Sequence, residues 1–230
     1  DLNDWIGPLG GYPGVITPNF DRLAQVSSVF HNAYAEVPAC SPSRTSTMFG
    51  VHAHKSGVYS NKQMWDDSAF IRSLNSIPQY FKNQGFDVIG SGKIFHANDE
   101  GDVSWDRYMK PQGFRSFKPV NKELLRDNKY GSFSWSGQHQ DENHGDYINA
   151  LKTARVLRDM PNNPEKPMFL AYGIFRPHLP LAVPQKYFDM YDLADVRYPY
   201  GLDGDFSDIE KLNLPETAKK LIQEHHDIHE

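Results

Sequence analysis

The sequence predicts an α/β fold, with a mixed but mostly parallel sheet flanked by helices, and three segments carry this prediction. Residues 29–37 and 86–90 are short and rich in β-branched and aromatic residues, which is typical of strands. Residues 168–174, with the sequence Met-Phe-Leu-Ala-Tyr-Gly-Ile, form the clearest buried strand. Because helical segments separate these strands, the order indicates βαβ units, whose strands lie parallel.

Helix start and stop signals support the alternation of strands and helices. Hydroxyl residues followed by proline mark two helix starts, at residues 17–18 and 76–78, and glycines close two of the helices. The expected helices span residues 17–26, 43–50, 76–85, 146–160 and 214–230.

The chain is long enough for one sizeable core or for part of a larger domain. Residues 97–145 hold many Gly, Asp, Ser and aromatic residues without a clear period, so we expect a loop-rich insert there. No apolar strand precedes Asp1, and the helix at 214–230 runs to the last residue. We therefore expect residues 1–230 to be an excerpt of one larger domain.

Composition excludes several classes of function. The chain has 24 Lys and Arg against 29 Asp and Glu, a net charge of −5, and no basic stripe that would bind nucleic acid. No apolar run approaches the roughly 20 residues that a membrane helix needs. With one cysteine there is no internal disulfide.

That cysteine, Cys40, lies between a predicted strand and a predicted helix, in the run Cys-Ser-Pro-Ser-Arg at residues 40–44. Free N–H groups and the helix dipole favour an anion at such a helix start, and Arg44 lies one turn further on. From the residues alone, Cys40 is either a small buried apolar side chain or a reactive group beside an anion site.

Polar side chains also follow the predicted strands, where ligand sites of parallel sheets form. These residues are Asp1, Cys40, Arg44, Lys93, His96 and His178. A carboxylate, a nucleophile, two cations and two imidazoles suit a tetrahedral anion bound to a metal. Taken singly, the charged residues and histidines also fit solvated loops.

Four motifs resemble those of one family. The Cys-x-Pro-Ser-Arg run at residues 40–44 resembles the signature of type I (formylglycine) sulfatases. Residues 92–96 resemble the Gly-Lys-x-x-His segment of the iduronate-2-sulfatase-like and choline-sulfatase-like group, and residues 177–180 resemble its Pro-His-x-Pro segment. Asp1 and Leu2 resemble the second half of an Asp-Asp-Leu metal site. The family usually has Leu-Thr-Gly-Arg where this chain has Met-Phe-Gly-Val at residues 48–51.

The resemblance implies an alkaline-phosphatase-like fold, with residues 1–230 forming the N-terminal portion of a single sulfatase catalytic domain. It implies that Cys40 is oxidised to formylglycine, by a formylglycine-generating enzyme or an anaerobic maturase. The formylglycine hydrate would be both the nucleophile and a ligand of Ca²⁺, with Mg²⁺ as the alternative. Asp1 would be a second ligand, and the remaining ligands would lie outside the 230 residues.

The resemblance also implies roles for the other candidates. Arg44 would hold the hydrate, while Lys93 and His178 would bind the sulfate oxygens. His178 or a neighbour would protonate the leaving alcohol, and His96 would deprotonate the second hydroxyl so that sulfate is expelled.

The implied activity is that of a sulfuric ester hydrolase acting on a sulfated carbohydrate or a small sulfate ester, in the periplasm or outside the cell. The 230 residues alone are expected to be inactive. One alternative is a phosphate or phosphonate monoester hydrolase on the same fold. The other is a non-catalytic relative in which Cys40 is never oxidised, which the departures at Phe49 and Val51 favour.

Overall fold

The computed structural model describes residues 2–96, 104–111, 140–162, 164–178, 183–197 and 216. The chain forms two compact units, residues 1–190 and residues 191–230. In the second unit the structure describes a short 3₁₀ helix, η4 (Leu193–Asp195), which the side chain of Asp192 caps by accepting the Ala194 N–H at 2.9 Å. All other elements below belong to the first unit.

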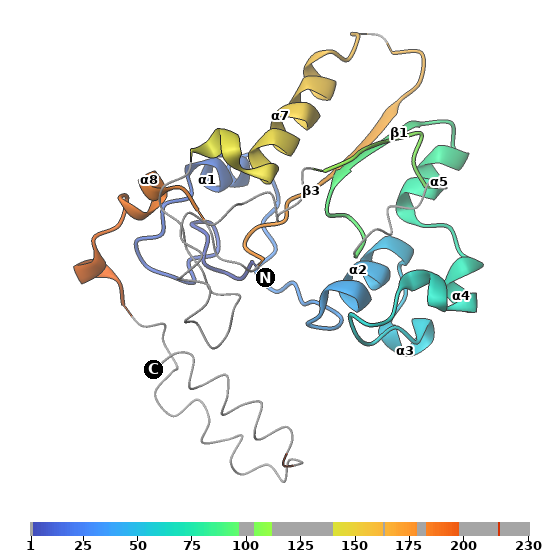
Figure 1. Cartoon of the computed structure of the whole chain (residues 1–230), viewed down its shortest axis with the longest axis horizontal. Helices are drawn as coiled ribbons and strands as arrows, with labels where there is room; N and C mark the ends of the chain where they lie inside the picture. The colour runs from blue at the N-terminus through green and yellow to red at the C-terminus, as the bar shows by residue number, and fades with distance from the viewer. Residues whose placement is uncertain are drawn as a thin grey trace. The chain divides into compact units, whose positions relative to one another are not determined.

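Three parallel strands, in the order β2-β1-β3, form the sheet of the first unit (Figure 1). The central strand β1 (Asp87–Gly92) pairs with β3 (Met168–Gly173) along its whole length, and with β2 (Arg107–Met109) from Ile89 to Ser91. From Val88 onward β1 is buried, as expected for a strand covered on both faces. The predicted α/β fold and the two strands near residues 86–90 and 168–174 are confirmed.

The strand predicted at residues 29–37 is wrong. The structure has irregular backbone there, and Phe30 and Tyr34 are 77% and 88% exposed. A β-prone segment becomes a strand only where a partner strand and a face to bury are available, and the described residues offer neither at this place. The parallel sheet therefore arises from β1, β2 and β3 and not from a unit that starts at residue 29.

Helices lie where the start and stop signals predict them. The predicted segments from 17 to 160 overlap α1 (Pro18–Ala24), α2 (Cys40–Phe49), α5 (Ile77–Asn83) and α7 (Gly145–Arg158). The short elements are α3 (Ala53–Ser56), η1 (Trp65–Asp67), α4 (Ala69–Arg72), η3 (Asp141–Asn143) and α8 (Gln185–Phe188). None of the helices in the described ranges is long and apolar enough to cross a membrane.

Helix α2 begins three residues earlier than predicted. The Ser43 N–H already donates to the Ala39 carbonyl at 3.1 Å, so the first turn starts at Cys40. Pro42 fits this turn because the first N–H groups of a helix have no partner within it. The helix ends as predicted at Gly50, whose φ of +65° is left-handed.

The core lies between β1 and the helices α2 and α5. Its buried centre consists of Val88, Ile94, Phe95 and Trp105, with further aromatic rings packed around it. Phe49, where the chain departs from the usual family sequence, lies 5.4 Å from Trp65 between ring centroids. Phe49 is thus part of the aromatic packing around the core.

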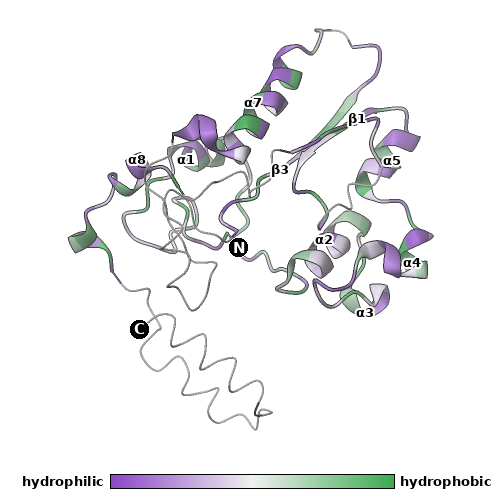
Figure 2. Cartoon of the chain, in the orientation of Figure 1, coloured by the Kyte–Doolittle hydropathy of each residue, from purple (hydrophilic) through white to green (hydrophobic). Residues whose placement is uncertain are grey.

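Helix α7 lies beside the sheet and contacts β1 (Figure 1). Its residues alternate between hydrophilic and hydrophobic bands (Figure 2). The side that is buried carries small or polar residues, Gly145, Asn149 and Thr153. Of the predicted insert at residues 97–145, the structure describes β2, η3 and the first residue of α7, and residues 97–103 and 112–139 lie outside the described ranges.

The ends of β1 and β3 approach closely at a pair of glycines, Gly92 and Gly173, which lie opposite each other. The Lys93 N–H donates to the Gly173 carbonyl at 2.8 Å. A Cβ at Gly173 would lie 1.9 Å from the Lys93 carbonyl oxygen, and a Cβ at Gly92 would lie 1.9 Å from the Gly173 carbonyl oxygen. Only glycine fits at either position.

We expect Gly173→Ala to lower the free energy of unfolding by roughly 2 kcal/mol or more, because the strand ends must separate to admit the methyl group. Urea unfolding measures this loss. Gly50→Ala is the control: its Cβ would meet nothing within 4 Å, so only the left-handed φ opposes it, at about 1 kcal/mol. Equal losses in the two variants would contradict a steric role for the glycine pair.

Candidate functional site

The start of α2 is held by a loop at residues 57–63. The Ser41 N–H donates to Oδ1 of Asn61 at 2.8 Å, and the Ser41 hydroxyl donates to the Gln63 carbonyl at 2.5 Å. Asn61 thereby serves as acceptor for a helix N–H that has no partner within the helix. Cys40, the first residue of α2, is half-buried beside this anchor.

Gln63 also shapes the loop that anchors α2. Its Oε1 accepts the N–H groups of Tyr59 and Ser60 at 2.9 and 3.2 Å, and its Nε2 donates to the Gly57 carbonyl at 2.9 Å. Sequence reasoning missed Asn61 and Gln63. Both lie in a polar stretch, and no local pattern distinguishes an amide that anchors a distant helix from one that faces solvent.

Lys93, just after β1, faces Cys40. Its Nζ lies 3.7 Å from the Cys40 Sγ, and the residue is only 8% exposed. Burial lowers the pKa of Lys93, an effect that Cys40 opposes and the positive charge of Arg44 reinforces. The lysine is thus a buried cation directed at the only cysteine.

Arg44 joins α2 to the segment that follows β1. Its Nη1 donates to the carbonyls of Lys93 and Ile94, at 2.5 and 2.8 Å. Burial lowers the pKa of Arg44, and Cys40 partly offsets this effect. The ion pairs among the described residues involve neither Arg44 nor Lys93, so no carboxylate in this part of the chain neutralises them.

His96 lies in the electrostatic field of the same group of residues. Burial is the main cause that lowers its pKa, and the charges of Lys93, Arg44 and His178 lower it further. Its Nδ1 is buried, with no hydrogen-bond partner among the described residues. The lowered pKa favours the neutral ring near neutral pH.

His178 is carried by the turn that follows β3. Its N–H donates to the Phe175 carbonyl at 3.1 Å, and the Arg176 guanidinium donates to the His178 carbonyl at 2.5 Å. The Arg176–Pro177 peptide bond is cis. The carboxylate of Asp146 accepts the N–H groups of Phe175 and Arg176, each at 2.9 Å. Asp146 is a further residue that sequence reasoning missed.

Five predicted site residues come together near the carboxyl ends of β1 and β3 and the start of α2. They are Cys40, Arg44, Lys93, His96 and His178. Asp1, which is predicted to bind the metal together with modified Cys40, lies outside the described residues. Two cations, two imidazoles and a helix start form a site for an anion.

The described residues do not by themselves fit a metal ion. No group of three or more His, Cys, Asp or Glu side chains in the described ranges could hold one. The neighbours of Cys40 are instead cationic, which repels a metal ion unless carboxylates are added. The predicted Ca²⁺ or Mg²⁺ site therefore depends on Asp1 and on ligands beyond the described part of the chain.

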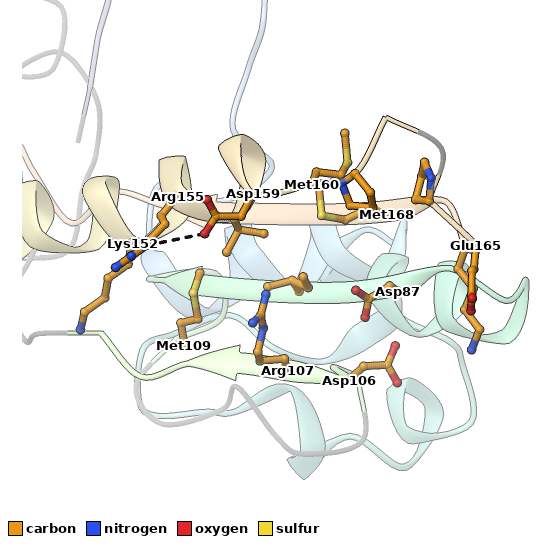
Figure 3. A pocket seen from close by; sticks show the side chains of 15 residues that line it. Asp87, Asp106, Arg107, Met109, Lys152, Arg155, Asp159, Met160, Glu165 and Met168 are labelled. Atoms are coloured by element: carbon orange, nitrogen blue, oxygen red, sulfur yellow. Dashed lines mark ion pairs between the residues drawn. The ribbon is translucent and has the colours of Figure 1, made fainter.

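A groove of about 870 Å³ lies elsewhere, between α7 and the beginnings of the strands (Figure 3). Charged side chains of both signs line it, and an ion pair joins Arg155 to Asp159 across 3.6 Å (Figure 3). None of the five predicted site residues lines this groove. Lys93, His96 and His178 follow the opposite ends of β1 and β3, and the other two residues lie on α2.

We expect Lys93→Met to raise the pKa of His96, because removing a nearby positive charge favours the protonated imidazole. An NMR titration of the His96 ring measures the shift. Lys82→Met is the control, since Lys82 pairs with Asp106 at 3.3 Å and its charge is not among those that lower the pKa of His96. An unchanged pKa of His96 in Lys93→Met would contradict the inference that the charge of Lys93 lowers this pKa.

Comparisons with known proteins identify relatives of this chain. A family model described as Sulfatase matches residues 1–197. A sulfatase of Formosa agariphila is 34% identical over 227 residues, which cover 93% of this chain and 44% of the relative. Iduronate 2-sulfatase of Mus musculus is 28% identical over 191 residues, 79% of this chain and 34% of the relative.

A solved structure shares the fold. The phosphonate monoester hydrolase of Agrobacterium radiobacter, an alkaline-phosphatase-like protein, matches with a TM-score of 0.57 and 18% identity, over 85% of this chain and 42% of that one. The chain thus spans less than half the length of these proteins. With most of its length matched by the family model and its motif residues gathered in one place, the chain belongs to the sulfatase family.

Proposed function

We propose that the protein is a sulfatase that hydrolyses the sulfate ester of a carbohydrate or of a small alcohol. The observation that carries this proposal is a pair of cations, the buried Lys93 and the half-buried Arg44, which converge beside Cys40 without a carboxylate among the described residues to neutralise them. The names of the relatives, a sulfatase and an iduronate 2-sulfatase, support the same class of reaction.

The charge balance of the site favours an anionic substrate. Burial of a cation without a carboxylate partner costs free energy, and for the same reason burial lowers the pKa of Lys93. A sulfate ester placed between Lys93 and the start of α2 would offset the cost with its negative oxygens, assisted by the helix dipole. Such a pocket binds the sulfuryl group more strongly as its oxygens gain charge during the reaction.

Cys40 is proposed to react as formylglycine, made by a formylglycine-generating enzyme or an anaerobic maturase. The hydrate supplies one hydroxyl as the nucleophile and a second that allows sulfate to leave by elimination. Lys93 Nζ, 3.7 Å from the sulfur that the modification replaces, is placed to stabilise negative charge on the hydrate. Arg44 uses Nη1 to hold the carbonyls after β1 and leaves Nε and Nη2 for the hydrate.

We propose that His96 and His178 each carry out one of the two proton transfers of the reaction. His96, neutral near pH 7 because its pKa is lowered, is suited to accept a proton from the second hydroxyl. His178, on the turn after β3, is proposed to bind the sulfate with Lys93 and to protonate the leaving alcohol.

We further propose Ca²⁺, with Mg²⁺ as the alternative, as the metal held by Asp1, modified Cys40 and ligands outside the described residues. The proposal includes export to the periplasm or to the medium.

A phosphate or phosphonate monoester hydrolase is the second candidate, favoured by the fold that the chain shares with a phosphonate monoester hydrolase. Phosphoryl and sulfuryl groups have the same tetrahedral shape, so a cationic pocket admits both. Sulfate and phosphate monoesters of one leaving group, assayed side by side on the complete gene product, separate the candidates. A higher kcat/KM for the phosphate ester would overturn the sulfatase proposal.

We expect Cys40 to carry an aldehyde when the complete gene product is made together with a formylglycine-generating enzyme. Trypsin releases residues 23–44 as one peptide, whose mass reports the loss of the thiol and whose aldehyde reacts with a hydrazide. Protein made without the modifying enzyme is the control. An intact thiol under both conditions would favour the non-catalytic alternative, to which Phe49 and Val51 point.

We expect Cys40→Ser to release about one alcohol per enzyme and then stop. A serine hydroxyl can accept the sulfuryl group, but it lacks the second hydroxyl needed to expel sulfate. Stoichiometric alcohol release and the added mass on the peptide of residues 23–44 measure the trapped ester. Continued turnover by this variant would show that Cys40 is not the nucleophile.

A further inference from the structure

Asp146, in the first turn of α7, joins that helix to the end of β3 by three hydrogen bonds. Its Oδ1 accepts the Phe175 N–H and its Oδ2 accepts the Arg176 N–H, both at 2.9 Å. Its own carbonyl accepts the Tyr172 hydroxyl at 2.7 Å. Both carboxylate oxygens are thus directed at successive backbone N–H groups of the turn that carries His178.

This turn needs such an anchor, because β3 ends at Gly173 and no strand among the described residues pairs with the N–H groups that follow. A negatively charged carboxylate at a helix start is stabilised by the helix dipole. That charge also acts on Arg176, where it opposes the effect of burial on the pKa of the guanidinium.

The contacts continue from Asp146 to His178. Asp146 holds the N–H groups of Phe175 and Arg176, the Phe175 carbonyl accepts the His178 N–H, and the Arg176 guanidinium donates to the His178 carbonyl. The backbone of His178 is therefore tied at both its N–H and its carbonyl to residues that Asp146 fixes.

We propose that Asp146 is a positioning residue, which sets the imidazole of His178 against the leaving alcohol without touching the substrate itself. This inference rests on the proposed function, because it takes the role of His178 from there. It assigns to the start of α7 a part in the protonation step.

Asp146→Asn tests the proposal. The amide keeps one acceptor oxygen and turns an NH₂ group toward the other backbone N–H, so the turn loses one bond and gains a repulsive contact. The assay compares a nitrophenyl sulfate, whose phenolate departs unprotonated, with an alkyl sulfate, whose alkoxide needs a proton. A displacement of about 1 Å can cost on the order of 100-fold, so we expect kcat/KM for the alkyl ester to fall about 10- to 100-fold further than for the aryl ester.

A double-mutant cycle with His178→Ala tests whether Asp146 acts through His178. We expect Asp146→Asn to change alkyl sulfate hydrolysis little in a protein that already lacks the His178 imidazole. Both substitutions impair the same step, protonation of the leaving alcohol by His178, so their effects on kcat/KM should not add. Asp159→Asn is the matched control: it removes the same charge from the exposed end of the same helix and should leave both esters unchanged.

Equal losses for both esters, or additive losses in the cycle, would overturn the proposal in favour of a purely structural role. If Asp146→Asn does not fold, Asp146→Glu, which keeps both acceptor oxygens on a longer arm, takes its place with the same two readouts. A wild-type protein that hydrolyses phosphate but not sulfate esters would overturn the proposed function alone, and aryl and alkyl phosphates would then test Asp146. A modified wild type that hydrolyses neither would overturn both.

Discussion

The close approach of β1 and β3 at Gly92 and Gly173 is the contact on which the rest of the site depends. The register places the two glycines opposite each other, and the Lys93 N–H donates to the Gly173 carbonyl at 2.8 Å. With no side chain between them, the backbone of β1 bends at Gly92, where φ is +77°. Lys93 then faces Cys40, while Phe95 enters the core. One backbone contact thus places a functional cation and a core residue within three positions of each other.

The positive electrostatic potential around Cys40 depends on the groups to which the neighbouring cations are hydrogen-bonded. Arg44 is bound by the carbonyls of Lys93 and Ile94, and no carboxylate in the described part of the chain pairs with it. A carbonyl satisfies a guanidinium N–H without a full negative charge, so the field around Cys40 stays positive. The same field contributes to lowering the pKa of His96. An anion-binding pocket and a neutral imidazole are therefore two consequences of one arrangement of charges.

Two further side chains fix the segments that flank this pocket. Asn61 accepts the Ser41 N–H at the start of α2, and Asp146 accepts two N–H groups after β3. Each holds backbone that its own helix or sheet cannot pair, at the point where a candidate catalytic residue is presented. The candidate catalytic residues thus lie on short segments whose geometry is set by hydrogen bonds from other elements. The aromatic core around Phe95 packs against α2 and the segment after β1.

The sequence by itself determined the mostly parallel α/β class, the boundaries of α1, α2, α5 and α7 to within a few residues, and the identity of the five side chains, Cys40 among them, that gather near the start of α2. These depend on local patterns, namely apolar runs, capping residues, glycines and short motifs. Only the tertiary structure decided that residues 29–37 form no strand, because strand formation needs a partner that local propensity does not report. It likewise decided the roles of Asn61, Gln63 and Asp146, since hydrogen bonds between segments 20 to 30 residues apart leave no mark in the local sequence.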